Sequence, residues 1–193
     1  MREVKAVFLD RDGVLNRVLV RNGKPYPPCN LSELKILPGV TEALNRLHNA
    51  GFILIVITNQ PDVVRGTQKR AVVEEINGVL QAQLRIDEFR VCWHDDADGC
   101  DCRKPKPGAL LQAADKFGID LSASFMIGDR WRDIEAGKLA GCKTVLIDYH
   151  YAETNHSRPH YRTSSLTGAV DWILKRKGDS SEKLWQFEDQ DFC

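Results

Sequence analysis

The sequence predicts an α/β fold, a three-layer sandwich in which helices cover both faces of a parallel sheet. Apolar, strand-like runs alternate with amphipathic helical stretches along most of the chain, and such alternation favours parallel strands joined by crossover helices. The run at 52–57 is wholly apolar, as expected of a strand buried on both faces. Polar side chains follow three of the runs, at the strand ends where parallel sheets bind ligands.

Strands are predicted where a short apolar run lies between turn residues. In chain order these runs span 4–9, 52–57, 89–93, 124–127 and 144–147. Helices are predicted where apolar residues recur at helical spacing, as at Val72, Val73, Ile76, Leu80 and Leu84. They span 38–48, 67–84, 107–117 and 132–140, and residues 170–177 lie in a last helix. Three of the helices are ended by glycines: Gly51, Gly118 and Gly141.

Two segments fall outside this alternation. The connection Arg17–Leu37 contains three prolines, and a loop of this length inside a compact domain is usually functional. It follows an acidic motif and is positioned to fold over it. The polar tail Gly178–Cys193 is expected either to be disordered or to dock its aromatic residues on this chain or a partner. We therefore predict one folded domain at 1–177 and a separate tail at 178–193.

The composition argues against several classes of protein. Lys+Arg and Asp+Glu each number 27 of the 193 residues, whereas a nucleic-acid binder should carry a basic excess. The longest apolar run is far shorter than a membrane span, and the first residues contain no apolar signal-peptide core. We therefore expect no nucleic-acid partner, no membrane span and no secretion.

The most informative motif lies directly after the first strand, where Asp10 and Asp12 precede a glycine. Residues at i and i+2 of an extended chain point to the same side, so the two carboxylates repel each other unless a cation lies between them. Oxygen ligands of this kind suit Mg²⁺. One carboxylate can attack phosphorus while the other transfers a proton. The alternative is a plain Asp-Gly turn.

Two further polar groups end other predicted strands. Thr58 and Asp129, together with Asp10, should therefore meet at one crevice. Thr58 and Asn59 offer a hydroxyl and an amide to a phosphate oxygen, although Thr-Asn at a strand end is also a common turn or helix cap. Asp133 either binds a metal, binds a metal-bound water or simply occupies the first turn of a helix.

A short basic segment precedes the helix predicted at 107–117. Arg103, Lys104 and Lys106 lie among prolines that restrict the backbone. A lysine near a transferring phosphoryl group offsets developing negative charge, whereas a solvated basic turn is the ordinary alternative. Arg130, which follows Asp129, is placed to meet a substrate phosphate.

Cysteine and histidine cluster in one stretch, in the pattern C-x-H-x5-C-x-C formed by Cys92, His94, Cys100 and Cys102. Four such ligands match tetrahedral Zn²⁺, and a site filled entirely by protein ligands is structural. The alternative is a set of free thiols with a surface histidine. The neighbouring acids are expected to be solvated loop residues: Asp95, Asp96 and Asp98.

Together the blocks DRDGVLN, TNQ, RKPKPG and GDRWRD resemble the four-motif set of haloacid-dehalogenase-type phosphatases. The C-x-H…C-x-C insert before RKPKPG is similar to that of a zinc-containing branch, which holds heptose-bisphosphate phosphatases and histidinol phosphatases. The resemblance spans roughly residues 4–150. It implies a Rossmann-like sandwich without a large cap domain, a zinc-stabilised loop beside the site and a cytoplasmic enzyme, for which we expect a monomer.

The resemblance also implies a role for each motif residue. Asp10 would be the nucleophile, and Asp12 would protonate the leaving oxygen and then activate water. Thr58 and Lys104 would stabilise the phosphoryl group, with Lys106 as the rival lysine. Substrate would be bound by Arg103, helped by Asn59 and Arg130. Mg²⁺ would be held by the Asp10 carboxylate, the Asp12 backbone carbonyl and Asp129, and Zn²⁺ by Cys92, His94, Cys100 and Cys102.

The reaction that this branch implies is Mg²⁺-dependent hydrolysis of a small phosphomonoester through an aspartyl-phosphate. Removal of the 7-phosphate of D-glycero-D-manno-heptose 1,7-bisphosphate is the first hypothesis, and histidinol-phosphate hydrolysis is the alternative. A non-catalytic, zinc-stabilised interaction protein is a hypothesis of a different class. Residues 59–62 read Asn-Gln-Pro-Asp, whereas Ser-Gly commonly follows TNQ in the heptose enzymes. This departure leaves the exact substrate open.

Overall fold

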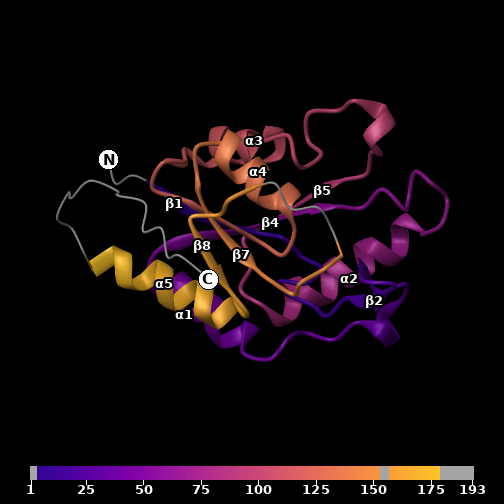
Figure 1. The fold of residues 1–193 in the computed structure, drawn as a ribbon, viewed down its shortest axis with the longest axis horizontal. Helices are drawn as coiled ribbons and strands as arrows, with labels where there is room; N and C mark the ends of the chain where they lie inside the picture. Colours follow the sequence, from indigo (N-terminus) through magenta and orange to yellow (C-terminus); the bar gives the residue numbers. More distant parts are fainter. Residues whose placement is uncertain (1–3, 153–156, 179–193) are drawn as a thin grey trace.

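The computed structural model describes residues 4–152 and 157–178, which form a sheet between two layers of helices (Figure 1). The sheet strands are β1 (Lys5–Leu9), β4 (Phe52–Asn59), β5 (Glu88–Cys92), β6 (Phe125–Gly128), β7 (Lys143–Ile147) and β8 (Tyr161–Thr163). The helices are α1 (Val40–Asn49), α2 (Arg70–Gln83), α3 (Gly108–Phe117), α4 (Trp131–Leu139) and α5 (Leu166–Gly178). A separate hairpin pairs β2 (Leu19–Arg21) with β3 (Lys24–Tyr26), and two 3₁₀ turns are η1 (Leu31–Glu33) and η2 (Asp96–Asp98).

The six strands of the main sheet are all parallel, in the order β5-β4-β1-β6-β7-β8. Strand β1 lies at the centre, where Phe8 pairs with Ile55 of β4 on one side and Met126 of β6 on the other. The chain first adds strands on the β4 side and then returns to add strands on the β6 side. This reversal opens a crevice at the carboxyl end of β1, which is where such sheets bind ligands.

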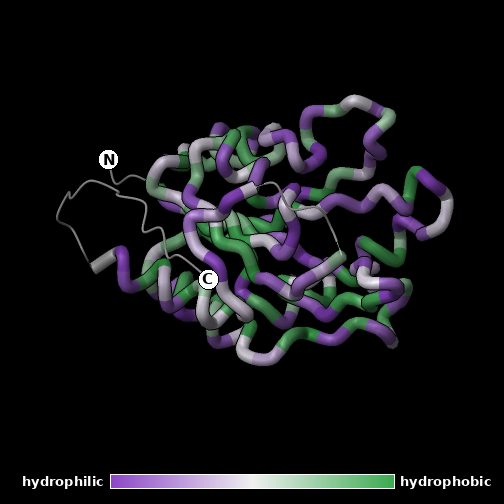
Figure 2. Tube along the Cα trace, in the orientation of Figure 1, coloured by the Kyte–Doolittle hydropathy of each residue, from purple (hydrophilic) through white to green (hydrophobic). Residues whose placement is uncertain are grey.

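Alternate residues of β1 point into different cores. Val7 and Leu9 are buried with apolar residues of α1, α2 and α5, whereas Ala6 and Phe8 are buried with residues of α3 and α4. This two-residue period is that of an extended strand. Figure 2 shows hydrophobic residues concentrated along the central strands, between the two helical layers. The predicted three-layer sandwich, with no large cap domain, is confirmed.

All five predicted strands and five predicted helices are present, with shifted boundaries. The helix predicted from Thr67 begins only at Arg70, because the amides of Thr67 and Gln68 both donate to the carbonyl of Asp62 in a turn instead. The strand β8 was not predicted, since its three residues carry no apolar run and pair with β7 only in the folded chain.

The loop predicted at 17–37 contains an unpredicted hairpin, β2–β3. Its turn residues Asn22 and Gly23 have φ of 50° and 72°, as a tight two-residue turn requires, and Asn-Gly is a sequence signal for that turn. The hairpin contacts the segment after β7, where the amide of Ala152 donates to the carbonyl of Gly23 at 2.9 Å. Residues 179–193 of the predicted tail lie outside the described residues, so the domain boundary stays a prediction.

Two helical glycines make a matched test of this packing. A Cβ at buried Gly137 would lie 2.6 Å from Met126 Cβ and 2.7 Å from Thr144 Cγ2, whereas a Cβ at exposed Gly78 would meet nothing within 4 Å. We expect Gly137→Ala to lower the free energy of unfolding by about 1–3 kcal/mol through overpacking. Gly78→Ala should raise it by up to about 1 kcal/mol through helix propensity. Urea unfolding measures both, and equal effects would contradict the close packing of α4.

Candidate active site

Three neighbouring strands bring the predicted polar groups to one edge of the sheet. Asp10 follows β1, and its amide donates to the carbonyl of Ile127 in β6 at 2.9 Å. Thr58 lies near the end of β4, and Asp129 directly follows β6. Since β1 lies between β4 and β6, these residues occupy adjacent strand ends, as the sequence predicted. All three are buried.

A cluster of carboxylates surrounds one lysine at this edge. Oxygen atoms of Asp10, Asp129 and Asp133 lie within 4.8 Å of one another. Lys104 Nζ donates to Asp10 Oδ1 at 2.8 Å and contacts Asp133 Oδ1 at 2.6 Å. It also donates to the carbonyl of Ile57 at 2.6 Å. Four ionisable groups from three separate segments therefore share one buried site.

Burial and neighbouring charges in this cluster shift the pKa values of Asp10, Asp129 and Lys104. Burial raises the pKa of Asp10 to about 6; Lys104 opposes this rise, and the charges of Asp133 and Asp12 add to it. Burial, followed by the charges of Asp10 and Asp133, raises the pKa of Asp129 well above its ordinary value. Burial alone would lower the pKa of Lys104, but the carboxylates of Asp10 and Asp133 outweigh it and raise that pKa. The site thus holds more negative charge than its lysine offsets.

The donor set fits a divalent cation. When all three carboxylates are ionised, they and the one ammonium carry a net charge of about −2, a state that burial disfavours without a cation. The oxygens of Asp129 have no hydrogen-bond partner among the described residues. The hydroxyl of Tyr151 approaches Asp129 and lowers its pKa, yet falls short of regular hydrogen-bond geometry. Hard oxygen ligands of this kind suit Mg²⁺. Asp133 is otherwise engaged, since its Oδ1 contacts Lys104 and its Oδ2 accepts from the Arg130 amide at 3.0 Å.

A glycine lets the loop after β1 approach Asp129. Gly13 has a φ of 91°, and a Cβ there would lie 2.0 Å from Asp129 Oδ2. Only glycine combines that backbone conformation with so close an approach. The glycine of the D-x-D-G motif therefore makes room for the carboxylate that follows β6.

Asp12 faces away from the carboxylate cluster, into a network that the sequence did not predict. Its Oδ2 accepts from Arg11 Nη2 at 2.8 Å and from Gln60 Nε2 at 2.9 Å, and its Oδ1 accepts from Asn16 Nδ2 at 2.9 Å. Arg11 is fully buried and also donates to Asn77 Oδ1 at 2.9 Å. A buried arginine beside the motif carried no signal in sequence, because its distant partner, Asn77, comes from α2.

The two candidate lysines, Lys104 and Lys106, have different surroundings in the structure. Lys104 lies in the carboxylate cluster, whereas Lys106 is exposed and donates to the carbonyl of Gly99 at 2.7 Å. Asn59 holds Lys104 in place, since its Nδ2 donates to the Lys104 carbonyl at 2.9 Å and its Oδ1 accepts from the Lys104 amide at 3.2 Å.

The side chain of Gln60 positions Thr58, because its Nε2 donates to the Thr58 hydroxyl at 2.9 Å.

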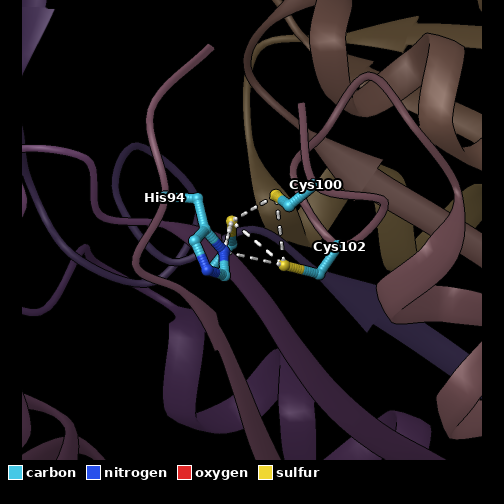
Figure 3. Close-up of side chains that lie close together, drawn as sticks. His94, Cys100 and Cys102 are labelled. Carbon is cyan, nitrogen blue, oxygen red and sulfur yellow. Dashed lines mark hydrogen bonds between the residues drawn. The ribbon is translucent and has the colours of Figure 1, made fainter. Parts of the chain in front are cut away.

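The four predicted zinc ligands lie together beside this loop. Cys102 Sγ is 3.3 Å from Cys92 Sγ and 3.4 Å from both Cys100 Sγ and His94 Nδ1. Figure 3 shows the imidazole of His94 and the thiols of Cys100 and Cys102 turned toward one another. Separations of this size suit four ligands each about 2.0–2.3 Å from one central ion. Burial raises the pKa of the Cys92 thiol to about 12, so its thiolate form needs a nearby cation.

Of the acids near the zinc ligands, Asp96 and Asp98 are exposed, as expected of solvated loop residues, but Asp95 and Asp96 also bind arginines. Asp95 accepts two hydrogen bonds of 2.6 Å from Arg65. Asp96 accepts from Arg103 Nε at 2.8 Å and from Arg132 Nη1 at 3.0 Å. The arginines come from three separate segments, and sequence alone gave no means of pairing them with these acids.

The comparisons with known proteins agree with this geometry. The family model of the haloacid dehalogenase-like hydrolases matches residues 28–141. A D-glycero-beta-D-manno-heptose-1,7-bisphosphate 7-phosphatase of Escherichia coli K12 is 31% identical over 195 aligned positions, covering 95% of each chain. The enzyme of that name from Pseudomonas aeruginosa is 38% identical over 146 positions, covering 73% of this chain and 79% of its own.

A solved structure shares the fold over most of its length. The D,D-heptose 1,7-bisphosphate phosphatase of B. bronchiseptica, complexed with magnesium and phosphate, superposes with a TM-score of 0.72 at 27% identity. The match covers 90% of this chain and 99% of that one.

The charge imbalance predicts the behaviour of Asp129→Asn without metal. The folded pKa of Asp10 lies at about 6, above its ordinary 3.8, so stability from this group is present below pH 3.8 and lost as the pH rises through 6. Removing the charge of Asp129 relieves the repulsion. We expect the metal-free variant to be about 1–3 kcal/mol more stable than the wild type at pH 7.

The two proteins should differ little at pH 4, because the raised pKa values of Asp10 and Asp129 favour their protonated forms there. Mg²⁺ should stabilise the wild type more than the variant. Urea unfolding at both pH values, with and without Mg²⁺, measures these differences. A variant less stable than the metal-free wild type at pH 7 would contradict the repulsion.

Proposed function

Because this chain belongs to the haloacid dehalogenase-like hydrolases, we propose that it is a phosphatase that removes the 7-phosphate of D-glycero-β-D-manno-heptose 1,7-bisphosphate. The observation that carries the proposal is the buried centre at the end of β1, where Asp10, Lys104 and Asp129 lie together. Relatives named for this reaction match over 95% of the chain, and their names favour the β anomer.

Asp10 is proposed as the nucleophile, because it lies at the crevice with a lysine 2.8 Å from its Oδ1. Its carboxylate attacks the phosphorus, a P–O bond to Asp10 forms, and the P–O bond to the sugar breaks. Asp12 gives a proton to the leaving sugar oxygen and then takes one from the water that hydrolyses the aspartyl-phosphate. Its carboxylate must leave Arg11 and Gln60 to do so, since those side chains now bind it.

The residues around Asp10 stabilise the transferring group. Lys104 offsets negative charge on the phosphoryl oxygens, and the hydroxyl of Thr58 donates to one of them. Asn59 acts through Lys104, whose backbone it binds at 2.9 and 3.2 Å. Arg103 and Arg130 are proposed to bind the substrate.

We propose that Mg²⁺ is held by the carboxylates of Asp10 and Asp129 and by the backbone carbonyl of Asp12. The charge of about −2 at the centre and the unpartnered oxygens of Asp129 support this assignment. When bound, Mg²⁺ would neutralise the carboxylates and orient the phosphate. A related structure contains magnesium and phosphate.

We propose further that Zn²⁺ binds Cys92, His94, Cys100 and Cys102 as a structural ion. The site would hold the loop that carries Arg103 and Lys104, because both residues directly follow Cys102. A monomer in the cytoplasm is proposed as the working form. No helix of the described residues has the length and apolar character that crossing a membrane requires.

The proposal is tested by phosphate release with Mg²⁺ from wild type and Asp10→Asn. The substrates are both anomers of heptose 1,7-bisphosphate, fructose 1,6-bisphosphate and histidinol phosphate. We expect turnover of the β anomer, with activity lower by at least about 10³-fold in the variant, which lacks the nucleophile. Turnover of histidinol phosphate alone would show that the alternative, histidinol-phosphate hydrolysis, is the correct activity. Phosphatase activity that Asp10→Asn leaves unchanged would refute the mechanism.

The two lysines give a paired test. Lys104→Gln should lower kcat by about 10²–10³-fold, because it removes the ammonium from the phosphoryl site. Lys106→Gln should change kcat less than about twofold, since Lys106 is exposed and binds only Gly99 and Asp101. Steady-state kinetics on the best substrate measures both. Comparable losses in the two variants would show that the assignment of Lys104 is wrong.

The zinc site is tested by elemental analysis of chelator-washed protein. We expect about one zinc ion per chain, which Cys100→Ser should abolish because a closed tetrahedral site loses a ligand. The matched control is Cys142→Ser, since Cys142 is a buried free cysteine outside the cluster. Protein that folds and keeps its activity without zinc would argue against the site.

A further inference from the structure

Two arginines close to the proposed catalytic lysine, Arg103 and Arg132, bind the carboxylate of Asp96. Arg103 directly precedes Lys104 and Arg132 directly precedes Asp133, and the side chains of Lys104 and Asp133 meet at 2.6 Å. Arg103 Nε donates to Asp96 Oδ1 at 2.8 Å, and Arg132 Nη1 donates to the same oxygen at 3.0 Å. Two segments, the loop before α3 and the start of α4, therefore bring guanidinium groups to one point beside the catalytic centre.

This group carries excess positive charge. Two guanidinium groups face the single carboxylate of Asp96. The neighbouring acid, Asp95, does not balance them, because it is bound by Arg65 through two hydrogen bonds of 2.6 Å and lies 3.8 Å from Arg103 Nη2. The side chains of the two arginines and Asp96 alone carry a charge of about +1, whereas the wider group is balanced, because Arg65 also contacts Asp62 at 3.4 Å. Two guanidinium groups around one exposed carboxylate still favour the binding of an anion at this point.

Asp96 is placed to exchange with another anion. Its side chain is 56% exposed, whereas those of Arg103 and Arg132 are 10% and 27% exposed. The carboxylate therefore lies on the solvent side of the two guanidinium groups. It belongs to η2, a turn of three residues that lies outside the sheet, between His94 and Cys100.

Both guanidinium groups are oriented by contacts other than Asp96. Arg103 Nη1 donates to the carbonyl of His94 at 3.2 Å. The guanidinium of Arg132 lies 5.0 Å from the ring centroid of Trp131, within the range of a cation–π contact. The arginines would therefore keep their places if Asp96 moved away, which is how a preorganised anion site behaves.

We propose that Arg132 joins Arg103 in binding the second phosphate of a sugar bisphosphate, and that Asp96 occupies this subsite until substrate displaces it. The inference rests on the proposed function and assigns a specificity-determining residue to it. A phosphate dianion offers three acceptor oxygens, which paired guanidinium groups match better than a single carboxylate does. The same three side chains would otherwise only fasten the zinc-ligand loop to α4.

The two roles predict opposite effects of Asp96→Asn. If Asp96 competes with substrate, its neutralisation frees the arginines and leaves the preference for a bisphosphate unchanged or increases it. If Asp96 only fastens the loop, its neutralisation weakens the arginine positions and lowers that preference, as Arg132→Gln would. A suitable control is Arg46→Gln, because Arg46 makes a comparable 2.6 Å ion pair with Asp171 between α1 and α5, away from the site.

The experiment measures kcat/KM for heptose 1,7-bisphosphate and heptose 7-phosphate in wild type and the three variants. We expect Arg132→Gln to lower the value for the bisphosphate about tenfold and to leave that for the monophosphate within about twofold. Asp96→Asn should keep or raise the bisphosphate preference, and Arg46→Gln should match the wild type. Equal losses on both substrates in Arg132→Gln, or a lost preference in Asp96→Asn, would overturn the inference.

A binding measurement separates this inference from the proposed function. If neither heptose ester is hydrolysed, the proposed function fails, and the subsite is tested by the rise in Tm with fructose 1,6-bisphosphate and with fructose 6-phosphate. The wild type should be stabilised at lower concentrations of the bisphosphate, and Arg132→Gln should lose that difference. A wild type that does not distinguish the two esters would refute the second-phosphate subsite.

Discussion

The active centre depends on the contact between Lys104 and the buried carboxylates of Asp10 and Asp133. Three acids at neighbouring strand and helix ends repel one another in a site that water barely reaches. The ammonium group, 2.8 Å from one acid and 2.6 Å from another, offsets part of that repulsion. It leaves a deficit of positive charge that a divalent cation matches. The unbalanced negative charge that destabilises the metal-free fold would therefore also favour metal binding.

Lys104 lies in the loop between η2 and α3, outside the helices and strands. Its backbone is bound by the side chain of Asn59, and the residue just before Arg103 belongs to the cysteine–histidine cluster. The loop is further joined to the segment after β4 by Arg65 and to α4 by Arg132. These contacts explain how a fold without a large cap can fix the lysine of its carboxylate cluster. The cysteine–histidine cluster, Arg103 and Lys104 thus lie on one stretch of chain.

The Asp12 network shows a second use of buried charge. Arg11 is fully buried, yet it is paired with Asp12 at 2.8 Å and donates to Asn77, so its burial leaves no unpaired charge. Gln60 joins this network to Thr58. The side chain proposed as the general acid is therefore held apart from the carboxylate cluster, and catalysis requires it to exchange these partners for the leaving oxygen.

Sequence by itself determined five strands of the main sheet, the helices and the strand ends that carry Asp10, Thr58 and Asp129, because each depends on short-range apolar periodicity and on residues next to it in the chain. It also grouped the four zinc-type ligands, which lie within eleven residues. The motif resemblance already favoured Lys104 over Lys106, but only the tertiary structure showed which acids Lys104 contacts. Only the tertiary structure decided that Asp12 binds Arg11 and Gln60 and that Asp96 binds two arginines. The reason is physical: Lys104 and Asp10 are 94 residues apart, and side-chain partners at such separations are set by how the layers pack.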